Sequence, residues 1–168
     1  MTEHPLLVFD FDGVIVDGMA EYWWSAWMAA QRLNAEPLGL GPDQVPQGFR
    51  RLRPWVHHGW EMVLLAAEMP RLDPERWTQD YVSEQALALQ RRGWSASQLQ
   101  EALDEARQQA VGSDRAAWLG LHHPFPGLVE RLQALQEEGV DWAVLTTKTA
   151  AFTAELLESL GLQPWRLD

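Results

Sequence analysis

The stretch of sequence that decides the fold is residues 6–17, which read LLVFDFDGVIVD. It begins with four bulky apolar residues and is then broken by Asp10, Asp12 and Gly13. A short apolar run that stops at a turn signal is typical of a buried strand. We therefore expect a strand over 6–9, with Asp10 and Asp12 at its carboxyl end and a sharp turn at Gly13.

The two aspartates stand where an open parallel sheet binds its ligands, at the carboxyl end of a strand. Two carboxylates at this place either bind a hard cation or divide nucleophilic and acid–base work between them. Asp10 is ionised at neutral pH and would need no activating base, whereas Asp12 would hold a proton for part of the cycle. A plain polar turn after a strand fits the tetrad equally well.

A second apolar run, residues 140–145, is followed by Thr146, Thr147 and Lys148, the only lysine of the chain. The threonine hydroxyls and N–H groups, the start of the next helix and the Lys148 ammonium could together hold a phosphate oxygen. Taken alone, Thr-Thr-Lys is more often a capped helix start. Because both polar segments follow strands that we expect to be parallel, they should share one rim of the sheet.

Between and after these runs, the pattern is helical. Periodicity and caps predict helices over about 19–33 and 50–70, with a loop over 34–49 between them. Three further helices are expected: one from Asp73-Pro74 to about Arg92, one capped by Ser95, and one from Ser113-Asp114 to near Leu121. Two more should end at glycines, at Gly139 and at Gly161. No further apolar strand is expected after Thr146.

Composition excludes several classes of protein. The chain has 168 residues, and its 13 basic and 24 acidic residues give a net charge of −11, which argues against binding nucleic acid. No apolar run approaches the roughly 18 residues of a membrane span. The absence of cysteine excludes disulfides and thiolate chemistry. With no secretory signal pattern at the start, a cytoplasmic protein is expected.

The segment from Leu7 to Asp17 resembles the first motif of the haloacid dehalogenase superfamily of phosphatases and phosphotransferases, and residues 143–148 resemble its second motif. Residues 124–128 are similar to the phosphoglycolate-phosphatase-like branch. The resemblance implies an α/β fold, a Rossmann-like parallel sheet with an inserted all-α cap. We expect the partial core to comprise residues 1–17 and 122–168, and the helical cap to comprise residues 18–121.

The resemblance also implies roles for the site. Asp10 would attack phosphorus and form an aspartyl-phosphate, and Asp12 would protonate the leaving group and later activate water. Both would bind Mg²⁺, Asp12 through its backbone carbonyl. The substrate phosphate would be bound by Thr146, Thr147, Lys148 and Gly13. Aspartate rather than threonine at position 12 indicates phosphorus chemistry.

The resemblance is incomplete at the C-terminal end. The family's third motif, a Lys or Arg, and its fourth, an acidic pair that completes the Mg²⁺ site, cannot be placed after Thr146. Glu155 and Glu158 are an acid pair on a helix and are interpreted as surface. We therefore expect a truncated form with low activity of its own and weak Mg²⁺ binding.

The expected function is a Mg²⁺-dependent phosphomonoester hydrolase that acts on a small phosphorylated metabolite, such as phosphoglycolate or a sugar phosphate. A phosphotransferase is a second hypothesis. A third is a non-catalytic relic that binds a partner through its tryptophan-rich cap, since the chain has 10 tryptophans.

Three further features have two interpretations each. Trp23, Trp24 and Trp27 would line a substrate pocket or, more often, pack cap helices together. The pairs His57-His58 and His122-His123 are poor metal sites, because adjacent side chains diverge. The basic cluster of Arg50, Arg51 and Arg53 would steer an anion or form a solvated, acid-paired face.

Overall fold

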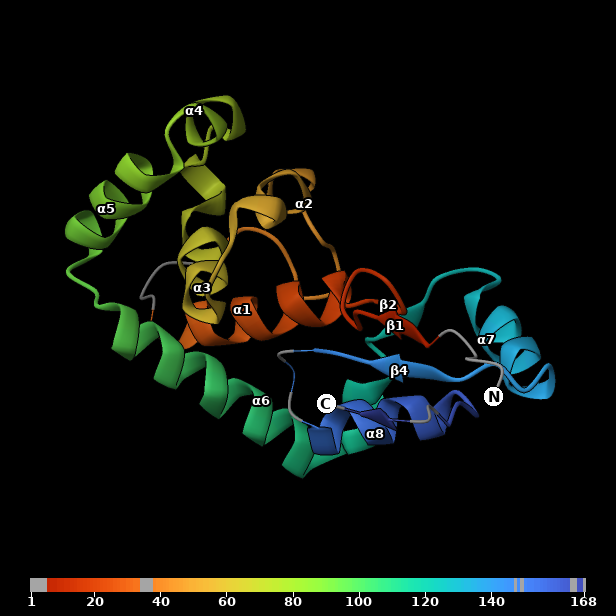
Figure 1. Ribbon diagram of the computed structural model, residues 1–168. Helices are drawn as coiled ribbons and strands as arrows, with labels where there is room; N and C mark the ends of the chain where they lie inside the picture. Colours follow the sequence, from red (N-terminus) through yellow and green to blue (C-terminus); the bar gives the residue numbers. More distant parts are fainter. Residues whose placement is uncertain (1–5, 34–37, 147, 149, 164–165, 168) are drawn as a thin grey trace. The chain divides into compact units, whose positions relative to one another are not determined.

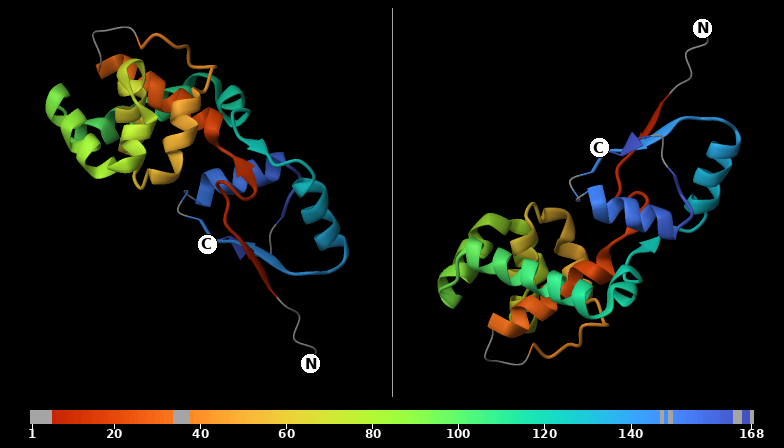
Figure 2. Two further views of the ribbon diagram at one scale, coloured as in Figure 1. Left: turned by 90° about the horizontal axis from the view of Figure 1, so that it is seen from above. Right: turned by 90° about the horizontal axis from the view of Figure 1, so that it is seen from below.

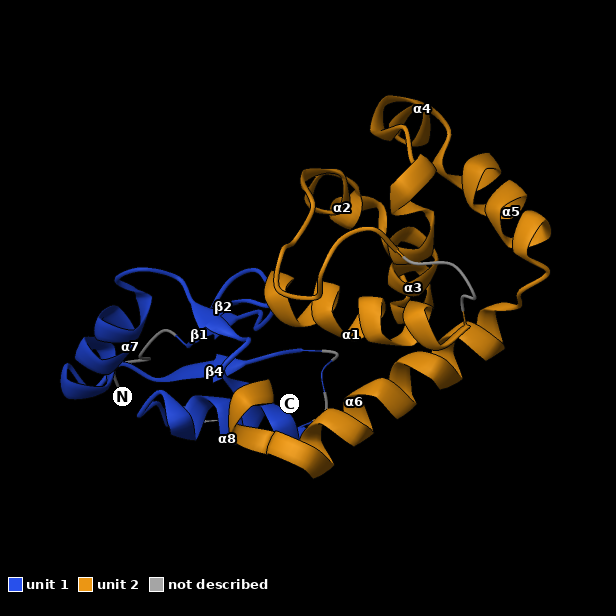
Figure 3. Cartoon of the chain, turned by 180° about the vertical axis from the view of Figure 1, so that it is seen from behind, with its two compact units in different colours: residues 1–18, 119–168 blue, residues 19–118 orange. Residues whose placement is uncertain are grey.

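The chain forms two compact units in its computed structural model, and each is described by itself. The structure describes residues 6–33, 38–146, 148, 150–163 and 166–167. The α/β unit comprises Met1–Gly18 and Leu119–Asp168, and the helical unit comprises Met19–Trp118 (Figure 3).

A parallel sheet forms the centre of the α/β unit (Figure 1). Its strands are β1 (Leu7–Phe9), β4 (Trp142–Val144) and β5 (Arg166–Leu167), in the order β1-β4-β5. β5 corrects the sequence analysis, which expected no strand after Thr146. A two-residue strand is too short to show an alternating pattern, and β5 forms because the free edge of β4 offers it hydrogen bonds.

Two helices cover the sheet, and both end at glycines with left-handed backbone. α7 (Leu128–Glu137) is followed by Gly139 with φ 72°, and α8 (Ala150–Ser159) by Gly161 with φ 69°. In Figures 1 and 2, α8 runs alongside the strands. The buried core of this unit consists of Phe11, Ile15, Val16, Leu132, Leu135, Trp142, Val144, Leu156, Leu157 and Leu162.

β1 differs from the buried strand that its sequence predicts. Leu6 is 45% exposed and Val8 is 55% exposed, and as alternate residues they face the same side of the sheet. β1 is also the end strand of the described sheet. The Leu7 N–H and the Phe9 carbonyl bond toward β4, so the Val8 backbone groups point to the open edge. Within the described residues, this edge and the adjoining apolar side chains are uncovered.

A short antiparallel ribbon, which the sequence analysis missed, forms from segments that are close in sequence to the two boundaries between the units. It pairs β2 (Val16–Asp17) with β3 (His123–Pro124), so that Asp17 stands opposite His123. Strands of two residues carry no periodicity, and this pairing depends on contacts between segments far apart in the sequence.

The helical unit is built from six helices and two short 3₁₀ turns within the described residues. Its elements are α1 (Met19–Leu33), α2 (Gln47–Leu52), η1 (Arg53–Trp55), α3 (Gly59–Glu68), η2 (Met69–Arg71), α4 (Pro74–Gln79), α5 (Tyr81–Arg92) and α6 (Ala96–Leu119). None of the helices in the described part of the chain has both the length and the apolar character that a bilayer crossing requires.

Two boundaries differ from the expected ones, and a third agrees with them. α2 begins at Gln47, inside the segment expected to be loop. The single helix expected from Asp73-Pro74 to Arg92 breaks at Asp80, whose side chain accepts a hydrogen bond from Ser83 N–H and caps α5. At Asp114 the backbone of α6 is non-helical (φ −151°, ψ 85°), which is where a separate helix was expected to begin.

Buried acidic side chains join the helices of this unit. Glu21 on α1 is fully buried, and both of its carboxylate oxygens accept hydrogen bonds from Arg107 on α6, at 2.8 and 2.9 Å. Glu68 on α3 accepts from Arg91 and Arg92 on α5, at 2.7 and 2.6 Å. These charge-assisted bonds fix which helices pair, and the apolar core between them supplies most of the burial.

Candidate active site

β1 and β4 bring the two polar segments to one end of the sheet. The strands are parallel neighbours with Phe9 opposite Val144, and the ladder continues with a hydrogen bond from Leu145 N–H to the Phe9 carbonyl, at 2.9 Å. Asp10 and Thr146 therefore both follow the carboxyl ends of their strands, at the same end of the sheet. We call this end, with the loop residues that follow each strand, the carboxyl rim.

Asp10 is exposed at the carboxyl rim, and its carboxylate is held by the backbone. Its Oδ1 accepts a hydrogen bond from the N–H of Phe11 at 2.7 Å. Phe11 is fully buried in the core of the α/β unit, so the peptide that binds Asp10 is itself anchored. An ionised carboxylate in this position is oriented by the fold and accessible to a ligand.

Asp12 and Lys148 form the closest charged contact of the rim. Asp12 Oδ1 lies 3.4 Å from Lys148 Nζ, and the two side chains are 23% and 14% exposed. The same oxygen is shielded from solvent and has no hydrogen-bond partner among the described residues. The Asp12 carboxylate is therefore held by charge attraction and retains an unused acceptor position.

Gly13 makes the turn that follows the aspartates. Its φ is +82°, a left-handed conformation that side-chain-bearing residues rarely adopt, and its N–H donates to the Val16 carbonyl at 2.8 Å. A Cβ at this position would meet no atom within 4 Å. The backbone conformation, rather than crowding, is what requires glycine here.

In the second polar segment, one hydrogen bond joins Thr146 and Lys148. Thr146 Oγ1 accepts a hydrogen bond from the N–H of Lys148 at 3.2 Å. Thr147, also expected to bind phosphate, lies outside the described residues. No hydrogen bond or ion pair between described residues joins Asp10 to Thr146, so the strand register alone brings these two residues to one rim.

The contact between Lys148 and Asp12 was not anticipated, because the sequence analysis assigned Lys148 to phosphate alone. The available signal was the single lysine of an acidic chain, four residues beyond the end of a strand parallel to the one that leads to the aspartates. Strand register can place the two loops together, but it does not say which side chains meet.

The rim offers part of a metal shell. Asp10 and Asp12 are hard oxygen donors, and the shielded Oδ1 of Asp12, which accepts no hydrogen bond from the described residues, could also bind a metal cation. Mg²⁺ is commonly held by one or two carboxylates and completes its shell with water and substrate oxygens, so these two residues fit it. Among the described residues, no group of three or more histidine and acidic side chains gathers to form a fuller site.

The remaining candidates are described within their own units. Trp23 is fully buried in the core of the helical unit, and its Nε1 donates to the Gly41 carbonyl at 3.0 Å, which supports a packing role. His57 and His58 are exposed, and His122 is buried whereas His123 is exposed. The side chains of His122 and His123 therefore have different surroundings.

These features, a parallel α/β unit with two aspartates at a strand end and an inserted helical unit, define a class of hydrolases. The sequence profile of the haloacid dehalogenase-like hydrolases matches residues 4–168, and the chain belongs to this family. The α/β fold with an inserted helical cap is thereby confirmed.

Relatives of known name are similar along nearly the whole chain. A phosphoglycolate phosphatase of Agrobacterium fabrum is 28% identical over 165 residues, which cover 94% of this chain and 54% of the relative. One of Pseudomonas putida is 26% identical over 157 residues, covering 94% of this chain and 46% of the relative. The chain thus spans about half the length of the curated relatives that it matches.

Solved structures share the fold. A predicted phosphoglycolate phosphatase from Haemophilus somnus superposes with a TM-score of 0.61 at 17% identity, over 99% of this chain and 63% of the other. A predicted phosphatase from Clostridium acetobutylicum gives a TM-score of 0.55 at 17% identity, over 99% and 61%.

Proposed function

We propose that the chain carries the nucleophilic half of a Mg²⁺-dependent phosphomonoester hydrolase that works through an aspartyl-phosphate. The observation that carries the proposal is the carboxyl rim, where an exposed, backbone-oriented Asp10 shares one end of the sheet with Asp12, Thr146 and Lys148. Family membership and the names of the relatives support it.

The chemistry would proceed in two steps. An oxygen of Asp10 attacks phosphorus, the bond from phosphorus to the leaving oxygen breaks, and Asp12 gives its proton to that oxygen. Asp12 then takes a proton from water as the water attacks the phosphorus of the aspartyl-phosphate, which releases phosphate and restores Asp10. Both steps use a carboxylate that is already placed at the rim.

Neighbouring groups would bind and balance charge. The Thr146 hydroxyl would donate a hydrogen bond to a phosphoryl oxygen, and the turn at Gly13 would lie against the phosphoryl group. We propose that Thr147 contributes its amide. Lys148, whose Nζ lies 3.4 Å from Asp12 Oδ1, would bring a positive charge to the side of the substrate phosphate. When bound at Asp10 and Asp12, Mg²⁺ would offset the repulsion between these carboxylates and a phosphate.

The proposed substrate is a small phosphorylated metabolite, with phosphoglycolate or a sugar phosphate as the class to test first. The named relatives are phosphoglycolate phosphatases, which motivates the first choice. The net charge of −11 would repel anions in general, so binding needs the local cations of the rim.

The test is a single-turnover assay with the chain in excess over phosphoglycolate or glucose 6-phosphate in the presence of Mg²⁺. Excess protein makes slow cleavage measurable. We expect phosphate release by the unaltered chain and none above background for Asp10→Asn, because an amide cannot attack phosphorus.

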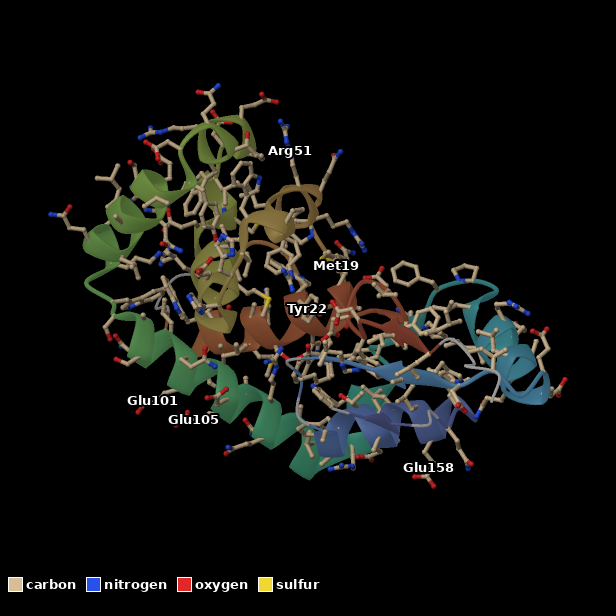
Figure 4. All side chains as sticks on the ribbon, in the orientation of Figure 1. Met19, Tyr22, Arg51, Glu101, Glu105 and Glu158 are labelled. Carbon is tan, nitrogen blue, oxygen red and sulfur yellow. The ribbon has the colours of Figure 1, made fainter. Side chains whose placement is uncertain are left out.

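The matched control is Glu158→Gln, which removes a carboxylate from the exposed side of α8 in the same unit (Figure 4). We expect it to release phosphate like the unaltered chain. Equal release by Asp10→Asn, or no release from any phosphate ester by the unaltered chain, would refute the proposal.

A further inference from the structure

The single lysine of the chain is turned toward the aspartates of the carboxyl rim. The Lys148 side chain is only 14% exposed, and its Nζ lies 3.4 Å from Asp12 Oδ1. The Lys148 N–H donates to Thr146 Oγ1 at 3.2 Å, which stabilises the turn that carries the lysine. The rim therefore holds a positive charge of its own, beside the carboxylates to which we assign Mg²⁺.

The contact between Lys148 and Asp12 is looser than the buried ion pairs described in the helical unit. Its 3.4 Å exceeds the roughly 2.7–3.2 Å of an N–H···O hydrogen bond, and the shielded Asp12 Oδ1 accepts no hydrogen bond from the described residues. The buried Glu68, by contrast, accepts a hydrogen bond from Arg92 Nε at 2.6 Å. Charge attraction alone holds Lys148 at Asp12, so a stronger ligand of this oxygen can open the pair.

The oxygen that faces Lys148 is also a suitable ligand for Mg²⁺. Mg²⁺ binds carboxylate oxygens at about 2.1 Å, well inside the distance from Asp12 Oδ1 to Nζ. A divalent cation at Asp12 would repel an ammonium held this close, because partly buried charges are screened only weakly by salt. Lys148 would then lose its reason to stay at Asp12, and its charge would become available to an anion.

We propose that Lys148 is a tethered cation that exchanges places with Mg²⁺ at Asp12. While no metal is bound, the Lys148 ammonium balances the charge of Asp12 at the rim. When Mg²⁺ binds there, Lys148 leaves Asp12 and turns its charge toward the substrate phosphate, which a chain of net charge −11 would otherwise repel. The inference rests on the proposed Mg²⁺ site and goes beyond it, since it makes Lys148 a positioning residue whose place depends on the metal.

The test is an NMR titration that uses the single lysine of the chain, since ¹³C-labelled lysine gives one Cε–Hε signal for the full chain. Mg²⁺ is exchanged for K⁺ at constant ionic strength. In Asp12→Asn, which lacks the countercharge, the lysine signal should be displaced before any Mg²⁺ is added. We expect Mg²⁺ to move the signal of the unaltered chain saturably toward that displaced position, because the contact with Asp12 opens.

Metal affinity gives a second readout, with Mn²⁺ as a paramagnetic substitute for Mg²⁺ whose binding is followed by EPR. Binding at the rim is the part that Asp10→Asn abolishes. Lys148→Met should tighten this binding by about threefold or more, because it removes the competing cation. The matched control is Arg131→Met, which removes a positive charge from an exposed ion pair of the same unit and should leave the binding unchanged.

The outcomes separate this inference from the proposed function. If Mn²⁺ binds at the rim no more tightly in Lys148→Met than in Arg131→Met, or if the lysine signal stays in place while Mg²⁺ binds, the exchange is wrong and Mg²⁺-dependent hydrolysis still stands. If no metal binding depends on Asp10, the proposed Mg²⁺ site and this inference fail together. The NMR titration uses the unaltered chain, so it decides the question even where Lys148→Met fails to fold.

Discussion

At the scale of single residues, the pairing of Asp12 with Lys148 is the most informative contact of the molecule. An acidic chain places its one lysine against a carboxylate whose Oδ1 has no other partner in the described residues. The contact gives Lys148 a structural role in addition to phosphate attraction. It also orients Asp12, the residue that we propose to exchange protons with the leaving group and with water.

The first prediction concerns this pair. Lys148→Met should lower the free energy of unfolding by about 1–2 kcal/mol, because it leaves a partly buried carboxylate without a countercharge. The measurement is urea denaturation at pH 7. Arg131→Met is the control, since the pair of Arg131 with Glu138 is more than half exposed at both side chains, 56% and 51%, and should contribute less than about 0.5 kcal/mol. Equal losses in the two variants would contradict the account.

The second prediction concerns Tyr81. Burial raises the pKa of the Tyr81 phenol, and the neighbouring Glu61 carboxylate raises it further. An unfolded tyrosine ionises near pH 10, so above that pH the unfolded state binds fewer protons than the folded state. The stability that Tyr81 contributes is therefore complete below about pH 10 and is lost as the pH rises toward the folded pKa.

The measurement is the free energy of unfolding against pH from about 9 to 11.5, for the unaltered chain and for Tyr81→Phe. Phenylalanine has no proton to lose, so the decline above pH 10 should become shallower by up to about 1.4 kcal/mol per pH unit. Profiles that stay parallel would show that Tyr81 ionises alike in both states.

At the scale of elements, the sequence predicts those whose signals are local. α1 occupies residues 19–33 as expected, and the caps at Asp73 and Ser95 form as predicted, with Glu75 N–H and Gln98 N–H as donors. The apolar runs that become β1 and β4 are recognisable because each ends at polar turn residues.

Elements that depend on distant contacts are not predictable in this way. β2, β3 and β5 have two residues each, too few for a period, and exist only because a partner strand is in place. Asp80 ends one helix and caps the next, and a sequence with aspartate inside a helical pattern is compatible with either outcome. The candidate site follows the same division: its two loops were predictable, but the contact of Lys148 with Asp12 was not.

The third prediction tests how α1 is joined to α6. Arg107→Met should lower the free energy of unfolding by about 3–5 kcal/mol, because it leaves Glu21 fully buried without its countercharge. The double variant Glu21→Gln with Arg107→Met should recover a large part of that loss. Thermal and urea denaturation measure both effects.

The control joins the same two helices near the surface. Arg32 on α1 lies 3.7 Å from Glu105 on α6, with side chains 32% and 70% exposed, and Arg32→Met should lose less than about 1 kcal/mol. If Arg107→Met is no more damaging than Arg32→Met, the buried pair does not hold these helices together.

At the scale of the whole molecule, the proposed catalytic site lies within one unit. The α/β unit carries every described residue of that site. The edge of β1 is open within the described residues, with Leu6 and Val8 exposed beside the strand that leads to Asp10.

The central claim is that Asp10 accepts a phosphoryl group. Beryllofluoride, a mimic of the phosphoryl group on aspartate, tests it directly when its binding to the chain is followed by ¹⁹F NMR with and without Mg²⁺. The account predicts a bound resonance that requires Mg²⁺, persists in Glu158→Gln and disappears in Asp10→Asn. A resonance that survives in Asp10→Asn, or its absence from the unaltered chain at saturating Mg²⁺, would contradict the account.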